Sequence, residues 1–291
     1  MTPSDYEYLR KLLKERSGLD LSVDKQYLVE SRLVPLARKE GLPGIAELAQ
    51  RMKGGAEALV TDVVEAMTTN ETFFFRDKLP FDHLRETVLP ALIRARAARR
   101  SIRIWCAASS TGQEPYSIAM ILKEMPALSG WRTEIVATDL SQAVLEKSKA
   151  GVFSQFEVQR GLPIQMLVKY FKQNGDLWQL NPDIRAMVQH KQLNLLHDFS
   201  HLGTFDVIFC RNVLIYFDQQ TKAAIFERMS RIIEPDGVLA LGAAESVVGI
   251  TDAFKLYPDR RGMYCVNTTR AAPRISVGSS AIPLKLVAAA R

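Results

Sequence analysis

The chain has 291 residues, of which 47% are hydrophobic and 24% are charged, as is usual for a globular protein of one large and one small domain. It has no run of 18 apolar residues and no apolar signal core at its start, which excludes a membrane span and argues against export, so we expect a cytoplasmic protein. The formal net charge of +6 arises largely in Arg94–Arg103 and the C-terminal tail, which we interpret as a solvated linker and tail, not a nucleic-acid surface.

The first third of the sequence predicts helices only. Ser4 can cap a helix that continues through Leu13, and a second helix is expected over residues 24–39 with Pro35 inside it. The apolar side of that second helix is expected to contain Tyr27, Leu28, Leu33, Leu36 and Ala37. Two further helices follow, so we expect an all-helical N-terminal domain that ends, with its linker, at residue 76.

Helical and strand patterns alternate after residue 77. Helices are expected over residues 78–98, 113–123, 141–150 and 219–233, and strands over 101–106, 133–137, 205–209 and 238–241. This alternation predicts an α/β domain with a doubly wound, mostly parallel sheet over residues 77–267. Ligands of such sheets bind beyond the carboxyl ends of the strands.

One stretch interrupts the alternation. Leu177–Leu180 and Ile184–Val188 are short β-like runs around Asn181-Pro182-Asp183, which predicts a small β hairpin inserted at about residues 171–191. The tail over residues 268–291 has no acidic residue and is expected to be disordered. The cysteines Cys106, Cys210 and Cys265 match no zinc pattern, so we expect reduced packing residues and no metal.

Polar or small residues follow three of the predicted strands. The first strand runs into Ala107–Gly112, a turn of small residues that would let a ligand approach the backbone, although a single glycine is a poor dinucleotide fingerprint and disfavours a dehydrogenase. The second strand ends at Asp139, which either accepts hydrogen bonds from a ribose or caps the next helix. Arg211, Asn212 and Tyr216 follow the third strand, where burial without partners would be costly, so we place them at a pocket.

Three segments together resemble the signature segments of the chemotaxis receptor methyltransferases, the CheR family. They are Thr68–Arg76, Ala107–Ser117 and Cys210–Asp218, in the same order and spacing as in that family. The resemblance extends over about residues 4–266. It implies a Rossmann-like class I S-adenosylmethionine-dependent methyltransferase with an N-terminal helical domain and an inserted β hairpin. It also implies a monomeric protein-glutamate O-methyltransferase whose partner is the cytoplasmic methylation region of chemoreceptors.

The resemblance also implies which residues contact S-adenosylmethionine or its product S-adenosylhomocysteine. They are Asn70, Thr72, Arg76, Glu114, Asp139, Asn194, Leu195, Arg211 and Asn212. Asn194 would bring its amide to the adenine edge, although a simple turn residue is the alternative. None of the four histidines, His83, His190, His197 and His201, matches a catalytic role, so we expect surface or turn positions for them.

The expected chemistry needs no general base. A glutamate acceptor, with an ordinary pKa near 4.3, is already ionised at neutral pH. Catalysis would then depend on orientation, and we predict that Arg76 and Tyr216 hold the acceptor near the methyl group. Lys25, Arg32 and Arg38, spaced by seven and six residues, match family positions that face the acidic receptor, although an ordinary solvated helix face is the alternative.

One departure and two alternatives remain. Family members that bind a receptor's C-terminal pentapeptide carry a glycine-rich insertion in the hairpin, whereas residues 171–189 contain only Gly175, so we expect action that is independent of the pentapeptide. A methyltransferase of the same fold could act on a small molecule or a nucleic acid. A module that senses the cofactor without catalysis is a third possibility, which intact Arg76, Asp139 and Tyr216 disfavour.

Overall fold

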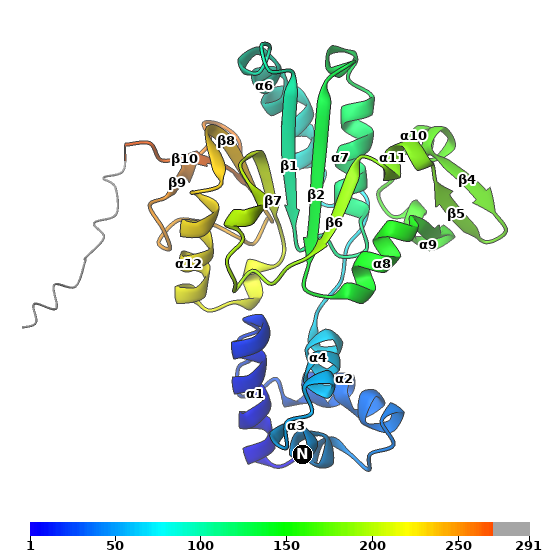
Figure 1. The fold of residues 1–291 in the computed structure, drawn as a ribbon, viewed down its shortest axis with the longest axis vertical. Coiled ribbons are helices and arrows are strands. Elements are labelled where there is room, and N and C mark those ends of the chain that lie inside the picture. The colour runs from blue at the N-terminus through cyan, green and yellow to red at the C-terminus, as the bar shows by residue number, and fades with distance from the viewer. Residues whose placement is uncertain (270–291) are drawn as a thin grey trace, which may run out of the picture.

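The computed structural model describes residues 1–269, and the predicted disorder of the tail falls almost entirely outside this range. The N-terminal part consists of α1 (Pro3–Ser17), α2 (Gln26–Lys39), α3 (Ile45–Lys53) and α4 (Glu57–Met67) (Figure 1). Their apolar sides meet in one core, in which Leu9, Leu13, Leu33, Leu48 and Val63 are fully buried. The predicted all-helical domain is therefore confirmed.

Two details of this domain differ from the prediction. Thr2, not Ser4, caps α1: its hydroxyl accepts a hydrogen bond from the Asp5 amide at 3.2 Å, and the Asp5 carboxylate accepts one from the Thr2 amide, which completes a capping box. Tyr27 is 63% exposed, while Val29 is fully buried in its place. The first error places the start of α1 two residues too late, and the second displaces the buried face of α2 by two residues near its beginning. Errors of this size are common at helix ends.

The larger part is built on a seven-stranded sheet in the order β6-β2-β1-β7-β8-β10-β9. The strands are β1 (Ser101–Ala107), β2 (Arg132–Asp139), β6 (Val188–Gln192), β7 (Phe205–Cys210), β8 (Ile233–Leu241), β9 (Phe254–Leu256) and β10 (Met263–Val266). The first five strands of the sheet order run parallel, and β10 is antiparallel to both of its neighbours. The predicted Rossmann-like α/β class is confirmed.

Helices cover both faces of this sheet (Figure 1). They are α5 (Leu79–His83), a π-helical turn (Leu84–Val88), α6 (Leu89–Ala95), α7 (Gln113–Lys123), α8 (Gln142–Ala150) and α12 (Gln219–Met229). Successive side chains of β1 point to opposite faces of the sheet. Ile102 and Ile104 pack into the apolar cluster on one face, and Trp105 packs into the cluster on the other. Within residues 1–269, no helix has the length and apolarity needed to cross a bilayer.

A β hairpin is inserted within the expected residues 171–191, but its turn lies at Gly175-Asp176, and the turn predicted at Asn181-Pro182-Asp183 is wrong. A small sheet of order β3-β5-β4 is formed by β3 (Val152–Ser154), β4 (Phe171–Asn174) and β5 (Leu177–Leu180), accompanied by α9 (Gln155–Gln159) and α10 (Ile164–Tyr170). The Asn-Pro-Asp sequence begins the short helix α11 (Pro182–Arg185), because proline suits a first helical turn. Val188 then opens β6 of the main sheet, so the inserted part starts near residue 152 and ends before β6.

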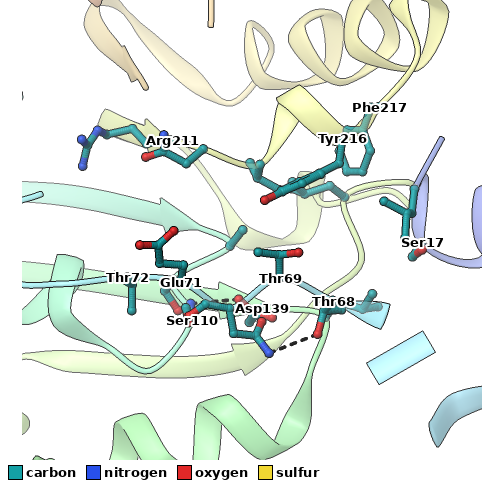
Figure 2. A pocket seen from close by; sticks show the side chains of 18 of the residues that line it. Ser17, Thr68, Thr69, Glu71, Thr72, Ser110, Asp139, Arg211, Tyr216 and Phe217 are labelled. Carbon is teal, nitrogen blue, oxygen red and sulfur yellow. Dashed lines mark hydrogen bonds between the residues drawn. The ribbon is translucent and has the colours of Figure 1, made fainter. Parts of the chain in front are cut away.

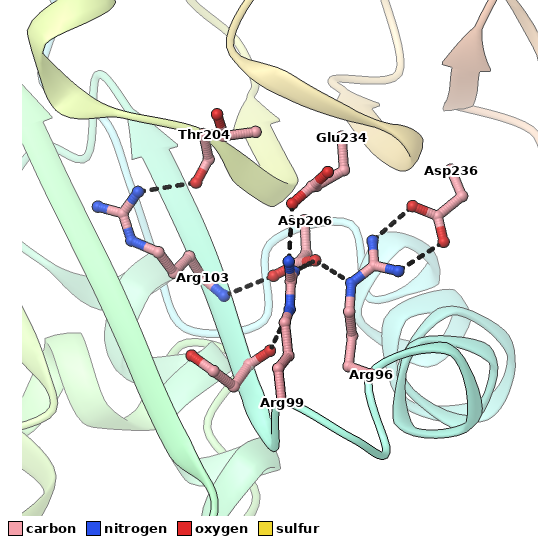
Figure 3. A network of polar contacts seen from close by, with 8 residues as sticks. Arg96, Arg99, Arg103, Thr204, Asp206, Glu234 and Asp236 are labelled. Carbon is pink, nitrogen blue, oxygen red and sulfur yellow. Dashed lines mark hydrogen bonds and ion pairs between the residues drawn. The ribbon is translucent and has the colours of Figure 1, made fainter.

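The basic run before β1 is not a solvated linker. Arg96, Arg99 and Arg103 surround the Asp206 carboxylate, which is 1% exposed (Figure 3). Arg96 Nε and Arg99 Nη2 donate to Asp206 Oδ1 at 2.7 and 2.6 Å, and the Arg103 amide donates to Oδ2 at 2.8 Å. Arg96 also makes a bidentate interaction with Asp236, in which Nη1 and Nη2 each donate to one carboxylate oxygen. These charges therefore join the amino ends of β1 and β7, at the edge of the sheet opposite the pocket described next.

Candidate active site

A pocket lies between the carboxyl ends of β1, β2 and β7 and the N-terminal domain (Figure 2). The side chains predicted to contact the cofactor or the acceptor all line it: Asn70, Thr72, Arg76, Glu114, Asp139, Asn194, Leu195, Arg211, Asn212 and Tyr216. The parallel sheet explains this convergence, because the carboxyl ends of neighbouring strands open at one edge. Lys25, Arg32 and Arg38 do not line the pocket.

The turn after β1 forms the floor of the pocket. Ala108, Ser110 and Gly112 have φ values of +58°, +50° and +96°, so the backbone curls tightly there. A Cβ on Gly112 would lie 2.2 Å from Ser148 Oγ, so only glycine fits between this turn and α8. The turn therefore exposes backbone and small side chains to a ligand.

Asp139 anchors this turn to the end of β2. Its two carboxylate oxygens accept hydrogen bonds from the amides of Ser110, at 2.9 Å, and Ser141, at 3.0 Å. The alternative role as helix cap is wrong, because Ser141 caps α8. Burial raises the pKa of Asp139, whereas the backbone donors oppose that shift. Each oxygen retains acceptor capacity for hydroxyl donors such as those of a ribose.

Arg211 and Glu114 form a buried ion pair beside the floor. The Arg211 side chain is 1% exposed, and its Nη1 donates to Glu114 Oε2 at 2.9 Å. Its Nη2 donates to the Arg76 carbonyl at 2.7 Å and to Asp77 Oδ2 at 2.8 Å. Burial raises the pKa of Glu114, and the guanidinium opposes that rise. The pair thus holds one positive and one negative charge at the pocket with little solvent to screen them.

Arg76 and Tyr216 approach the pocket from different segments. Arg76 Nη1 donates to the Glu71 carbonyl at 2.6 Å, and its guanidinium lies 5.6 Å from the centre of the Phe73 ring. Tyr216 follows β7, and Figure 2 shows its ring lying across the pocket with the hydroxyl directed inward. The two side chains border the same space without bonding to each other.

The N-terminal domain closes one side of the pocket through the end of α1. Ser17 and Leu19 belong to the lining, and the Asp20 amide donates to the Tyr216 carbonyl at 2.9 Å. Gly18, which lies between Ser17 and Leu19, has a φ of +78°, and a Cβ there would lie 2.7 Å from the Phe217 ring. The residues after β7 are therefore packed directly against α1.

Asn194 lies at the pocket, but its amide does not have the predicted freedom. Its Nδ2 donates to the Arg16 carbonyl at 2.7 Å, and its Oδ1 accepts from the Leu196 amide at 2.9 Å. The side chain therefore joins α1 to the segment after β6. Any contact with an adenine edge would use the backbone here, the second N–H of Nδ2 or the remaining acceptor capacity of Oδ1.

Glu245 is a site residue that sequence reasoning missed. Oε2 accepts hydrogen bonds from the amides of Asn212 and Gly242 at 2.7 and 2.8 Å, and Oε1 from those of Val213 and Leu214 at 3.0 and 2.8 Å. One carboxylate thus holds the turn that carries Asn212, whose φ is +58°. The available signal was an acidic residue shortly after a buried strand, the position already used to find Asp139.

One of the four histidines is also misplaced by the prediction. His190 lies in β6, and its Nε2 is 2.7 Å from Ser148 Oγ. Burial, reinforced by Lys149, lowers the pKa of His190 to about 4, so it is neutral at pH 7. No histidine lines the pocket. His190 instead packs β6 against Ser148 of α8, next to the turn after β1.

The sequence matches the CheR methyltransferase all-alpha domain over residues 4–68 and the CheR methyltransferase SAM binding domain over residues 70–263. The chain belongs to the CheR methyltransferase family. It is 42% identical over 258 residues to chemotaxis protein methyltransferase 1 of Pseudomonas aeruginosa, covering 87% of this chain and 94% of the relative. It is 40% identical over 268 residues to the chemotaxis protein methyltransferase of Vibrio parahaemolyticus, covering 88% and 94%.

The pocket of this CheR methyltransferase fits S-adenosylmethionine, the cofactor of the family. Ser109 Oγ and Arg211 Nε are buried and have no hydrogen-bond partner among the described residues, although both belong to residues that line the pocket. Buried polar atoms are rarely left without partners, so these two favour a polar ligand. Asp139 offers acceptors for ribose hydroxyls, Glu114 a negative charge for an amino group, and Leu140 and Leu195 an apolar wall.

Proposed function

We propose that this CheR methyltransferase forms methyl esters on glutamate side chains of methyl-accepting chemotaxis receptors, in the cytoplasm, during adaptation. The relatives that cover most of the chain are named chemotaxis protein methyltransferases, which supports this pathway. The observation that carries the proposal is the pocket itself, where Arg76 and Tyr216 border the cofactor site and no histidine is present. This arrangement suits an acceptor that arrives already ionised.

The proposed transfer moves no proton. When bound, S-adenosylmethionine supplies a methyl group on a sulfonium; the carbon–sulfur bond breaks as a carbon–oxygen bond forms to the carboxylate. Asp139 would hold the ribose, and Glu114 with Arg211 would hold the charged end of the donor. Arg76 and Tyr216 would then orient the glutamate, since orientation alone can supply roughly 7–11 kcal/mol of barrier reduction.

The hold on the acceptor should be partial. Arg76 already donates to the Glu71 carbonyl, and its side chain is 22% exposed, so water competes for its remaining donors. A tight ion pair would stabilise the nucleophile's charge and slow its attack on the methyl group. A shared, partly solvated guanidinium can steer a carboxylate without this penalty.

The direct test uses a tritiated methyl donor and receptor-rich membranes. Methyl esters on glutamate release volatile methanol in alkali, whereas methylated nucleic acids and amines do not. Tyr216→Phe and Arg76→Ala are expected to lose most of this signal while keeping the wild-type circular dichroism spectrum. Near-normal turnover in both variants would remove the two residues from the proposed roles, and absence of alkali-labile label with the wild type would refute the acceptor.

We also propose that the activity does not depend on a receptor's C-terminal pentapeptide. The turn between β4 and β5 consists of Gly175 and Asp176 only, without the glycine-rich extension found in pentapeptide-binding relatives. Receptors with and without the last five residues should therefore be methylated at equal initial rates. Retention of the protein on an immobilised pentapeptide would contradict this proposal.

A nucleic-acid acceptor gains little support from the basic composition. Three of the arginines that produce the charge excess are engaged by Asp206, Glu234, Asp236 and Glu134 away from the pocket. The receptor remains the favoured partner, and we expect Lys25 and Arg38 to face it. The Lys25 side chain is 43% exposed, and Arg38 is exposed and has no side-chain partner within residues 1–269.

A further inference from the structure

Arg32 is turned toward the rest of the molecule, whereas Arg38 on the same helix is exposed. The Arg32 side chain is half-buried and turned toward the segment that follows α4. Nη1 donates to the carbonyls of Met67 and Thr68, at 2.6 and 2.8 Å, and Nη2 donates to Thr69 Oγ1 at 2.9 Å. The guanidinium thus has contacts within the molecule, and its predicted position facing the receptor stays a prediction.

Two of these acceptors are main-chain carbonyls at the end of α4, which the helix itself leaves without partners. The last carbonyls of α4 cannot be satisfied within the helix, and the negative end of the helix dipole favours a cation beside them. The last turn of α4 contains no basic residue of its own. Arg32 supplies that cation from α2, 35 residues earlier in the chain, and fixes where the helix ends and the linker begins.

The linker held by Arg32 is a wall of the cofactor pocket. Met67, Thr68 and Thr69 all line it. From Thr68 the contacts continue inward: Asn70 Nδ2 donates to Thr68 Oγ1 at 3.1 Å, and the Asn70 carbonyl accepts from Ser110 Oγ at 2.8 Å (Figure 2). The Ser110 amide in turn donates to Asp139. Hydrogen bonds thus link Arg32, Thr68, Asn70 and Ser110 in turn to Asp139, the residue proposed to bind the ribose.

We propose that Arg32 is a positioning residue for S-adenosylmethionine binding. Its guanidinium holds residues 67–69 in place, so that Asn70 and the turn after β1 form the pocket before the donor arrives. The inference deepens the proposed function, but its test depends only on cofactor binding. On this view, Arg38 of α2 and Lys25, the residue just before this helix, remain available to the receptor, while Arg32 supports the pocket.

The test is isothermal calorimetry with S-adenosylhomocysteine on the full chain. Arg32→Ala is expected to weaken binding at least tenfold, because three donors are lost at once. Arg32→Lys should recover part of the loss, since an ammonium can reach one or two of the acceptors but cannot fork between them. Lys39→Ala removes one positive charge from the exposed part of the same helix, and it should bind as the wild type does.

A second variant keeps the test decisive if Arg32→Ala fails to fold. Thr69→Val removes one acceptor of Arg32 without changing any charge, and it should weaken binding about threefold. In the methylation assay, Arg32→Ala should raise the KM for the donor.

Three outcomes separate the possibilities. Wild-type affinity for S-adenosylhomocysteine in a folded Arg32→Ala variant would overturn the inference, as would wild-type affinity in both Arg32→Lys and Thr69→Val. A raised KM for receptor with an unchanged KM for the donor would assign Arg32 to receptor recognition alone and would also overturn the inference. If the wild type bound S-adenosylhomocysteine but methylated no receptor, the proposed acceptor would fail while the role of Arg32 stood.

Discussion

Replacing Glu245 by Gln would measure how strongly one carboxylate organises the turn after β7. Each of its oxygens accepts two backbone amides, so an amide side chain in either orientation leaves two of the four donors facing an NH₂ group. A hydrogen bond to a charged group contributes about 1.5–3 kcal/mol. Glu245 is only partly buried, so water can replace part of the loss, and we expect a decrease of about 2–4 kcal/mol in the free energy of unfolding.

The measurement is urea unfolding followed by circular dichroism, together with initial methylation rates. Because the turn carries Asn212 and leads to Tyr216, kcat should fall even under conditions where the variant is fully folded. Glu15→Gln is the matched control: Glu15 makes only a 3.9 Å surface pair with Lys11, and its loss should change stability by less than about 0.5 kcal/mol. If Glu245→Gln unfolds within that same margin and turns over normally, the carboxylate does not organise the site.

Two further predictions follow from the packing around the pocket. Gly18→Ala should destabilise the protein by more than the roughly 1–2 kcal/mol expected for a left-handed alanine, because its Cβ would also meet the Phe217 ring at 2.7 Å; wild-type stability in urea would show that α1 does not press on that segment. His190 has a folded pKa of about 4, below its usual value near 6.5, so the unfolded chain binds the proton more readily and stability should fall as pH drops from 6.5 toward 4. His190→Asn should flatten that part of the stability profile, and an unchanged slope would contradict the assignment.

The regular part of the fold could be predicted because its signals are local. The helix expected over residues 113–123 is found with those bounds, and the alternation of helices and strands was sufficient for the sheet class. The small sheet was misjudged because pairing is not local. Nothing in Leu177–Leu180 indicates that its partners are β4 and the three-residue β3, 25 residues earlier.

The site shows the same division. Position in the sequence placed Asp139, Arg211 and Tyr216 at one edge, because parallel strands open together. Orientation could not be predicted: Arg32 turns inward because α4 ends beside it, and the Asn194 amide is taken by a carbonyl of α1. Both outcomes depend on contacts between segments far apart in the chain, which spacing along one helix or loop does not encode.

The boundary between the two family regions falls at residues 68–70, and these residues line the cofactor pocket. The two halves are therefore not independent modules that evolution could exchange freely. A substitution at Gly18 would disturb Phe217 on the other side of this boundary, and one at Arg32 would release Thr69 within it. A hybrid joined at residue 69 from two distant relatives should therefore bind the donor poorly even when each half folds well. Compensating changes across this boundary are the expected trace of that shared wall in the sequences of the family.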